Sequence, residues 1–214
     1  MIVSRGRQFI FVHIPKTGGT AMTLALEDRA MADDIIVADT PKGRQRRRRL
    51  KDVRTSGRLW KHSSLAEAAG LITRREIQDY FIFTLVRNPW DRFVSYYHWL
   101  RAQDFENRAV TLARTLDFSD FLNHPHTAAS VSSHPYDWYL TDGAGRIRCD
   151  CYIRLEHLGT DLAPLSDHLG FVPQMARANE SDRDRDYRRY YATADVETVA
   201  ALCHGDIQRF GYTF

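Results

Sequence analysis

The feature that most constrains the fold is an apolar run that ends in a glycine-rich turn. Residues 9–14 (Phe-Ile-Phe-Val-His-Ile) are followed by residues 15–20 (Pro-Lys-Thr-Gly-Gly-Thr) and by the helix-prone stretch 21–30. This order predicts a buried strand, a tight loop and the start of a helix. Such a junction collects backbone N–H groups at the positive end of the helix dipole, and glycines let a ligand approach the backbone closely. We therefore expect a site for a phosphate-like anion, with Lys16 and the two threonine hydroxyls contributing.

A second junction of the same kind follows later in the chain. Residues 80–86 (Tyr-Phe-Ile-Phe-Thr-Leu-Val) are almost entirely apolar and aromatic, as expected for a central parallel strand covered on both faces. Arg87 comes next, and a helix is predicted to run from there to about residue 103. Asn88 is a favourable N-cap and Pro89 suits the first helical position. The sequence thus predicts a second strand-to-helix anion site.

The remaining pattern alternates short strands with helices. This alternation predicts an α/β fold with a mostly parallel central sheet flanked by helices, with ligands at the carboxyl ends of the strands and both anion loops at the same edge. Residues 104–146 show only short helical pieces. We expect further strands at 35–38, 58–62 and 147–154, a helix capped by Ser63 or Ser64, and helices at 117–123, 158–169 and from about 195 to 210.

Length and composition indicate one globular domain over residues 1–214. The chain is 43% hydrophobic and 27% charged, with a formal net charge of only +3, which is typical of a folded soluble protein. The charge is unevenly placed, because nine basic residues lie between positions 42 and 58 against the single acid Asp52. We expect this stretch to be a mobile loop that attracts an acidic partner. The basic residues are Lys42, Arg44, Arg46, Arg47, Arg48, Arg49, Lys51, Arg54 and Arg58.

The cysteines and the hydropathy pattern indicate the cellular compartment of the protein. Cys149, Cys151 and Cys203 are odd in number and lack Cys-x-x-Cys spacing, so they predict neither a disulfide framework nor a zinc site. No apolar run approaches the ~18 residues needed to span a bilayer. We expect a cytoplasmic protein without a transmembrane segment.

The first loop is not a Walker A sequence, because its lysine precedes the glycines. It resembles instead the 5′-phosphosulfate loop of sulfotransferases, which use 3′-phosphoadenosine 5′-phosphosulfate as the sulfuryl donor. Residues 83–97, with Arg87 after a strand and Ser95 in the next helix, are similar to the 3′-phosphate-binding segment of that superfamily. Further segments resemble the branch that includes Golgi carbohydrate sulfotransferases and related bacterial enzymes, namely residues 60–64, 86–92, 154–158, 179–181 and 206–212.

The resemblance implies a P-loop-like three-layer fold and a sulfotransferase activity. Lys16 would stabilise the leaving phosphate, and His62 would be the base that deprotonates a hydroxyl, or an amine, of a carbohydrate or small-metabolite acceptor. Lys61 would bind donor or acceptor. No metal and no nucleic-acid partner are expected, and the sequence does not indicate an oligomeric state. The implied donor contacts are Pro15, Lys16, Thr17, Gly18, Gly19, Thr20, Arg87, Ser95, Arg183 and Arg185.

Several alternatives remain open from the sequence. His13 rivals His62 as the base, although a buried strand residue with a satisfied ring is the simpler interpretation. Arg183 and Arg185 alternate with aspartates, which equally suits a solvated, self-neutralised surface. Tyr96, Tyr97 and Trp99 fit a core better than an adenine platform. The alternative functions are a P-loop-type nucleotide kinase and a binding module for nucleic acid or anionic glycan built on the basic stretch.

Overall fold

The computed structural model describes residues 1–176 and 183–214. The chain divides into two compact units, a first unit of residues 1–86 and 136–179 and a second unit of residues 87–135 and 180–214. Each unit is built from two separate stretches of chain. The expectation of one domain over residues 1–214 stays a prediction.

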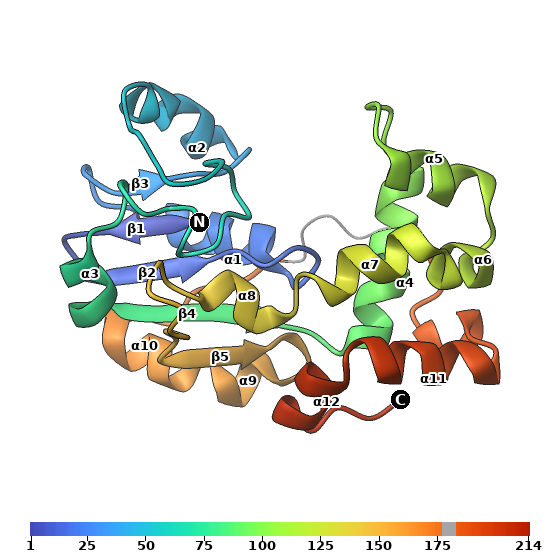
Figure 1. Cartoon of the computed structure of the whole chain (residues 1–214). Coiled ribbons are helices and arrows are strands. Elements are labelled where there is room, and N and C mark those ends of the chain that lie inside the picture. The colour runs from blue at the N-terminus through green and yellow to red at the C-terminus, as the bar shows by residue number, and fades with distance from the viewer. Residues whose placement is uncertain (177–182) are drawn as a thin grey trace. The chain divides into compact units, whose positions relative to one another are not determined.

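The first unit contains a five-stranded sheet in the order β3-β1-β2-β4-β5, which Figure 1 shows from β3 at the top to β5 at the bottom. β2 pairs in parallel with β4, and β4 pairs in parallel with β5, whereas β1 runs antiparallel to both β2 and β3. Four of these strands therefore run in one direction, and the predicted α/β class with a mostly parallel sheet is confirmed. The strands are β1 (Ile2–Ser4), β2 (Phe9–Val12), β3 (Ile35–Ile36), β4 (Phe81–Val86) and β5 (Cys151–Arg154).

The register brings three strand ends to one edge of the sheet. Val12 pairs with Thr84, and Val86 pairs with Arg154, while the Thr84 hydroxyl donates to the Val12 carbonyl at 2.7 Å. The carboxyl ends of β2, β4 and β5 therefore lie at the same edge, as predicted. The glycine-rich loop follows β2 at this edge of the sheet. Arg87 directly follows Val86, the last residue of β4.

Helices of the first unit cover the sheet. Met22 of α1 and Leu165 of α10 pack with Phe11 and Phe83 in one buried cluster on one face of the sheet, and Ile10 and Ile82 on the other face are also buried. The helices are α1 (Gly19–Glu27), α2 (Pro41–Arg46), α3 (Arg74–Asp79), α8 (Tyr136–Leu140), α9 (Leu158–Asp161) and α10 (Ala163–Leu169), with 3-10 turns η1 (Arg47–Leu50) and η2 (Leu155–His157).

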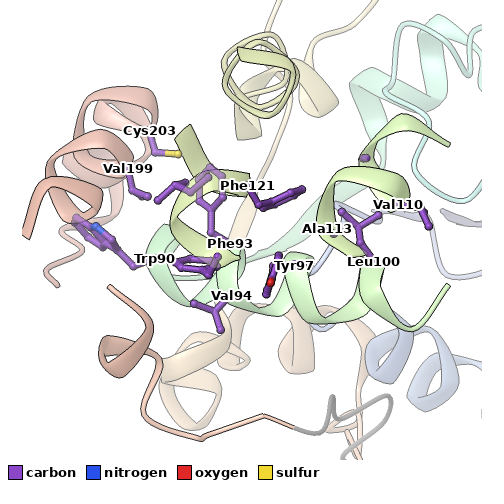
Figure 2. Packing of buried hydrophobic residues seen from close by; sticks show 13 residues of the cluster. Trp90, Phe93, Val94, Tyr97, Leu100, Val110, Ala113, Phe121, Val199 and Cys203 are labelled. Atoms are coloured by element: carbon purple, nitrogen blue, oxygen red, sulfur yellow. The ribbon is translucent and has the colours of Figure 1, made fainter. Parts of the chain in front are cut away.

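The second unit is helical and has its own core. Figure 2 shows side chains of α4 at helical spacing, including Trp90, Phe93 and Tyr97, packed with Phe121 of α6 and Val199 of α11. Tyr96 and Trp99 pack against this cluster, so the prediction that the α4 aromatics form core and cover is confirmed. The helices are α4 (Pro89–Arg101), α5 (Arg108–Thr115), α6 (Phe118–Asn123), α7 (Pro125–Ser132), α11 (Thr193–Leu202) and α12 (His204–Phe210), with the 3-10 turn η3 (Tyr187–Tyr190).

The predicted strand at 58–62 and the helix after Ser63 are wrong, because this segment forms irregular turns held by distant partners. The Met1 amino group donates to the Lys61 carbonyl at 2.9 Å. The strand at 147–154 is shorter than predicted and begins at Cys151. Before it, the Asp150 carboxylate accepts from the Ile82 N–H at 2.7 Å, so a side chain takes an N–H that strand pairing would use.

The basic stretch 42–58, predicted as a loop, is helical up to residue 50, whereas residues 51–58 form turns and irregular backbone. Thr40 caps α2 by accepting from the Gly43 N–H, and Pro41 opens the helix. Helix α2 continues into η1, so residues 41–50 form ordered helical turns. The predicted last helix is also divided, into α11 and α12, at Cys203.

Candidate functional site

The glycine loop, residues 15–20, connects β2 to α1. Lys16 has φ 65° and Gly18, the N-cap of α1, has φ 88°, so the chain passes twice through the left-handed region within three residues. The Thr17 side chain is fully buried and its hydroxyl donates to the Ile14 carbonyl at 2.9 Å. Thr17 therefore stabilises the turn with its side chain, while Lys16 and Thr20 are half-buried.

Two glycines of the loop are required by close packing. A Cβ on Gly18 would lie 2.8 Å from Leu155 Cδ1, and a Cβ on Gly19 would lie 2.0 Å from Cδ2 of His13. The N-terminus of α1 has neither a side-chain cap nor an acidic residue in its first turn. Helix N–H groups at such an end attract an anion. The loop thus has the shape and polarity of an anion cradle.

His13 follows β2 and packs against this loop. Its side chain is buried, and its ring stacks on Phe11 with centroids 5.8 Å apart. Nδ1 is buried without a hydrogen-bond partner among the described residues, so the ring is not satisfied as expected. Burial, helped by neighbouring cationic groups, holds the pKa of His13 well below its ordinary value, which keeps the ring neutral at neutral pH.

The structure brings His62 beside the glycine loop. Its Nδ1 lies 2.8 Å from the His13 carbonyl oxygen. Since a carbonyl only accepts, Nδ1 carries the proton, and in the neutral ring Nε2 carries the lone pair. The ring meets His13 and Trp60 edge-on, with centroids 4.5 and 4.9 Å apart. Lys61, the neighbour of His62, pairs with Asp39 at 2.7 Å.

In the second unit, two arginines far apart in the sequence converge on one carboxylate. Arg87 donates from Nε and Nη2 to Asp91 Oδ2 at 2.9 and 2.6 Å. Arg183 donates from Nη2 to Asp91 Oδ1 at 2.6 Å. The side chains of Arg87, Asp91 and Arg183 are 14%, 18% and 12% exposed, respectively. We call these three residues the arginine cluster. Ser95 is buried on the same face of α4, four residues after Asp91.

Arg183 and Arg185, which the sequence predicted together, differ in environment. Arg183 belongs to the arginine cluster, whereas Arg185 is exposed. Asp184 pairs instead with Arg189 at 2.8 Å. The segment 179–181 lies outside the described residues. The sequence analysis did not single out Asp91 as a partner of Arg87. Its position four residues after Arg87 was the available signal.

The basic stretch separates into anchored and exposed side chains. Lys42 donates to the Glu27 carbonyl, Arg46 to the Asp34 carbonyl at 2.9 Å, and Arg49 to the Ala32 carbonyl. Six other side chains are exposed and make no ion pair with a carboxylate of the described residues. We call them the basic surface, which consists of Arg44, Arg47, Arg48, Lys51, Arg54 and Arg58.

The described residues show no cluster suited to a metal ion, no disulfide and no membrane-spanning helix. Within residues 1–176 and 183–214, no group of three or more histidine, cysteine or acidic side chains is placed to hold a metal ion. The three thiols are free, and burial raises the pKa of Cys151 to about 11 and of Cys203 to about 12. None of the described helices is both long and apolar enough to cross a membrane.

The fold and the glycine loop place the chain in a class of α/β proteins with a glycine-rich strand-to-helix junction at the carboxyl ends of parallel strands. A family model described as "Sulfotransferase family" matches residues 1–213. The chain belongs to the sulfotransferase family, and the predicted resemblance is confirmed.

A solved sulfotransferase structure supports the fold. The crystal structure of mouse sulfotransferase SULT7A1 complexed with PAP is similar with a TM-score of 0.52 and 16% identity, over 96% of this chain and 85% of that chain. At this identity the likeness concerns the fold alone. A comparison with curated proteins found no match.

Proposed function

We propose that this sulfotransferase transfers the sulfuryl group from 3′-phosphoadenosine 5′-phosphosulfate to a hydroxyl, or an amine, of a carbohydrate or small metabolite. The observation that carries the proposal is the glycine loop, in which Gly18 and Gly19 admit no side chain and the N-terminus of α1 is uncapped. Such a loop suits the phosphosulfate end of the donor. Membership of the sulfotransferase family supports the same chemistry and argues against the nucleotide-kinase alternative.

The donor has a second anionic end, its 3′-phosphate, which needs its own cradle. We assign this end to Arg87, Ser95 and Arg183. Arg87 and Arg183 converge on Asp91, and guanidinium groups bind phosphate oxygens with two parallel N–H donors. The buried Nη1 of Arg183 has no partner among the described residues, so a phosphate oxygen would satisfy it. The observed donors therefore fit a phosphate group.

The proposed reaction is an in-line displacement at sulfur. The acceptor oxygen forms a bond to sulfur while the bond from sulfur to the bridging phosphate oxygen breaks, and the acceptor proton passes to Nε2 of His62. The tautomer assigned from the His13 carbonyl contact supports this role. Lys16 would neutralise the charge that develops on the leaving phosphate. His13, with its depressed pKa and buried ring, is the weaker candidate for the base.

The acceptor would approach from the side of Trp60. This side chain is 39% exposed, lies edge-on to His62, and has the Arg58 guanidinium 5.2 Å from its ring centroid. An exposed aromatic ring next to the proposed base offers an apolar surface to the ring of an acceptor. Arg44 and Arg47 of the basic surface contribute to the lowered pKa of Asp39, after Lys61, and would attract an anionic group on the acceptor.

Calorimetric titration with 3′-phosphoadenosine 5′-phosphate, without magnesium, tests the donor site. We expect binding by the wild type and at least a tenfold loss of affinity in Arg87→Ala, since one cation of the phosphate cradle is removed. Arg75→Ala is the matched control, because Arg75 forms an exposed pair with Asp79 at 3.1 Å. Absence of binding, or equal binding of ATP only with magnesium, would contradict the proposal.

His62→Ala separates catalysis from donor binding. We expect kcat to fall by about 10²–10⁴-fold, the usual contribution of a general base, with the affinity for 3′-phosphoadenosine 5′-phosphate unchanged. Turnover would be followed with labelled donor over a panel of carbohydrate and small-molecule acceptors. A kcat close to that of the wild type would exclude His62 as the base.

A further inference from the structure

Asp91 lies between two cationic side chains that would otherwise repel each other. Its Oδ2 accepts from Arg87 and its Oδ1 from Arg183, in both cases at 2.6 Å from an Nη2 atom. All three side chains are less than one-fifth exposed. Two guanidinium groups and one carboxylate give these three side chains a formal charge of +1.

One buried N–H donor of the arginine cluster has no acceptor among the described residues. Arg183 Nη1 is buried and has no partner among the described residues. Leaving a buried charged donor unsatisfied destabilises a protein, so such an atom is expected where a ligand supplies the acceptor. The carboxylate occupies Arg183 Nη2, which fixes the guanidinium plane and hence the direction of Nη1.

We propose that Asp91 is a positioning residue that holds Arg87 and Arg183 as one preorganised cradle for the 3′-phosphate of the donor. The inference rests on the proposed function and adds a residue that acts through the two arginines. The carboxylate does not bind the phosphate, because two anions repel. It selects the phosphate indirectly, by aligning the donors that do bind it.

If phosphate affinity depends on the net charge of the cluster, Asp91→Asn should have the opposite effect from the one expected if affinity depends on the alignment of the arginine donors. If net charge alone determined affinity, loss of a carboxylate would strengthen the binding of a phosphate dianion. If alignment matters, the amide keeps one acceptor oxygen but gains an NH₂ group that faces one of the arginines, and the cradle is disordered. The sign of the change therefore distinguishes the two explanations.

The experiment compares two nucleotides that differ only in the 3′-phosphate. Dissociation constants for 3′-phosphoadenosine 5′-phosphate and adenosine 5′-monophosphate are measured by calorimetry on the full chain, and their ratio is the readout. We expect Asp91→Asn to lower the preference for the 3′-phosphate at least tenfold, and Asp91→Glu to retain more of it than Asp91→Asn. An unchanged or increased preference in Asp91→Asn would overturn the proposal.

Asp184→Asn is the matched control, because it removes the same charge from an exposed pair with Arg189 at 2.8 Å. Its preference should equal that of the wild type. In an Arg183→Ala background, Asp91→Asn should have a smaller effect, as a double-mutant cycle requires for coupled residues; equal effects in both backgrounds would contradict the proposal. If Asp91→Asn fails to fold, Asp91→Ser replaces it, because serine also lacks the carboxylate that aligns the two arginines, and a wild-type preference in this variant would overturn the proposal.

The two hypotheses fail in different ways. A wild type that shows no preference for the 3′-phosphate contradicts the proposed function and, with it, the role of Asp91. A wild type that prefers the 3′-phosphate, together with an Asp91→Asn variant that keeps this preference, contradicts only the role of Asp91.

Discussion

Gly19 is a position in the proposed donor loop that has no space for a side chain. A Cβ there would lie 2.0 Å from Cδ2 and 2.4 Å from Nε2 of the His13 ring, and this ring is buried. A methyl group therefore forces the ring or the start of α1 to move. Because the same contact places the N–H groups of α1, stability and donor binding are linked at this residue.

We predict that Gly19→Ala destabilises the protein by about 1–3 kcal/mol, the usual range for overpacking, and weakens binding of 3′-phosphoadenosine 5′-phosphate. Urea unfolding and calorimetry are the measurements. Gly159→Ala is the control, since nothing lies within 4 Å of a Cβ at that position, and it should be neutral or slightly stabilising. Wild-type stability in Gly19→Ala would show that the loop has more room than the structure indicates.

Individual residues also show which contacts could be predicted from the sequence and which could not. Lys16 and the glycines could be identified because their chemistry and spacing are local. The contact between the His13 carbonyl and His62, which sets the tautomer of His62, could not be identified from the sequence, because the two residues are 49 positions apart. Likewise, the sequence pattern treated Arg183 and Arg185 alike, whereas only Arg183 reaches Asp91.

At the scale of elements, the start of α4 is connected to segments that are distant in sequence. Asn88 accepts from the Trp90 N–H at 3.1 Å as the N-cap. Its amide nitrogen donates to the Thr213 carbonyl at 2.9 Å and to the Tyr187 hydroxyl at 3.3 Å. The cap predicted from the sequence is confirmed, and the same side chain also ties the helix start to the C-terminal segment.

We predict that Asn88→Asp destabilises the protein by about 1–3 kcal/mol, because the cap acceptor remains but a buried carboxylate then faces a carbonyl oxygen. Asn107→Asp is the control, since exposed Asn107 caps α5 by accepting from Ala109 N–H at 2.8 Å. This variant should change the stability by less than about 0.5 kcal/mol. Chemical unfolding of both variants is the measurement, and equal effects would contradict the role of the amide donor.

At the scale of the whole molecule, neither compact unit is a continuous piece of chain. The first consists of residues 1–86 and 136–179, and the second of residues 87–135 and 180–214. The chain therefore passes between the units at three points, and excision of either unit requires several cuts. This connectivity favours the prediction of one domain over residues 1–214.

We predict that thermal unfolding is a single transition, with a calorimetric enthalpy equal to the van't Hoff enthalpy. Differential scanning calorimetry is the measurement, and saturating 3′-phosphoadenosine 5′-phosphate should shift the whole transition upwards. Two transitions, of which the nucleotide moves only one, would show that the units unfold independently.

The two strand-to-helix junctions, the α/β class and the start of α4 could be predicted from local sequence, because hydrophobic periodicity, glycines and cap residues act over a few positions. The antiparallel position of β1, the turns at residues 58–62 and the contact of Arg87 and Arg183 with the same carboxylate are features of the folded chain. Each of these depends on a partner that is distant in sequence, such as the Met1 amino group for Lys61 or the Asp91 carboxylate for Arg183. No local pattern encodes which distant groups meet, because that depends on how the packed chain satisfies its buried polar atoms.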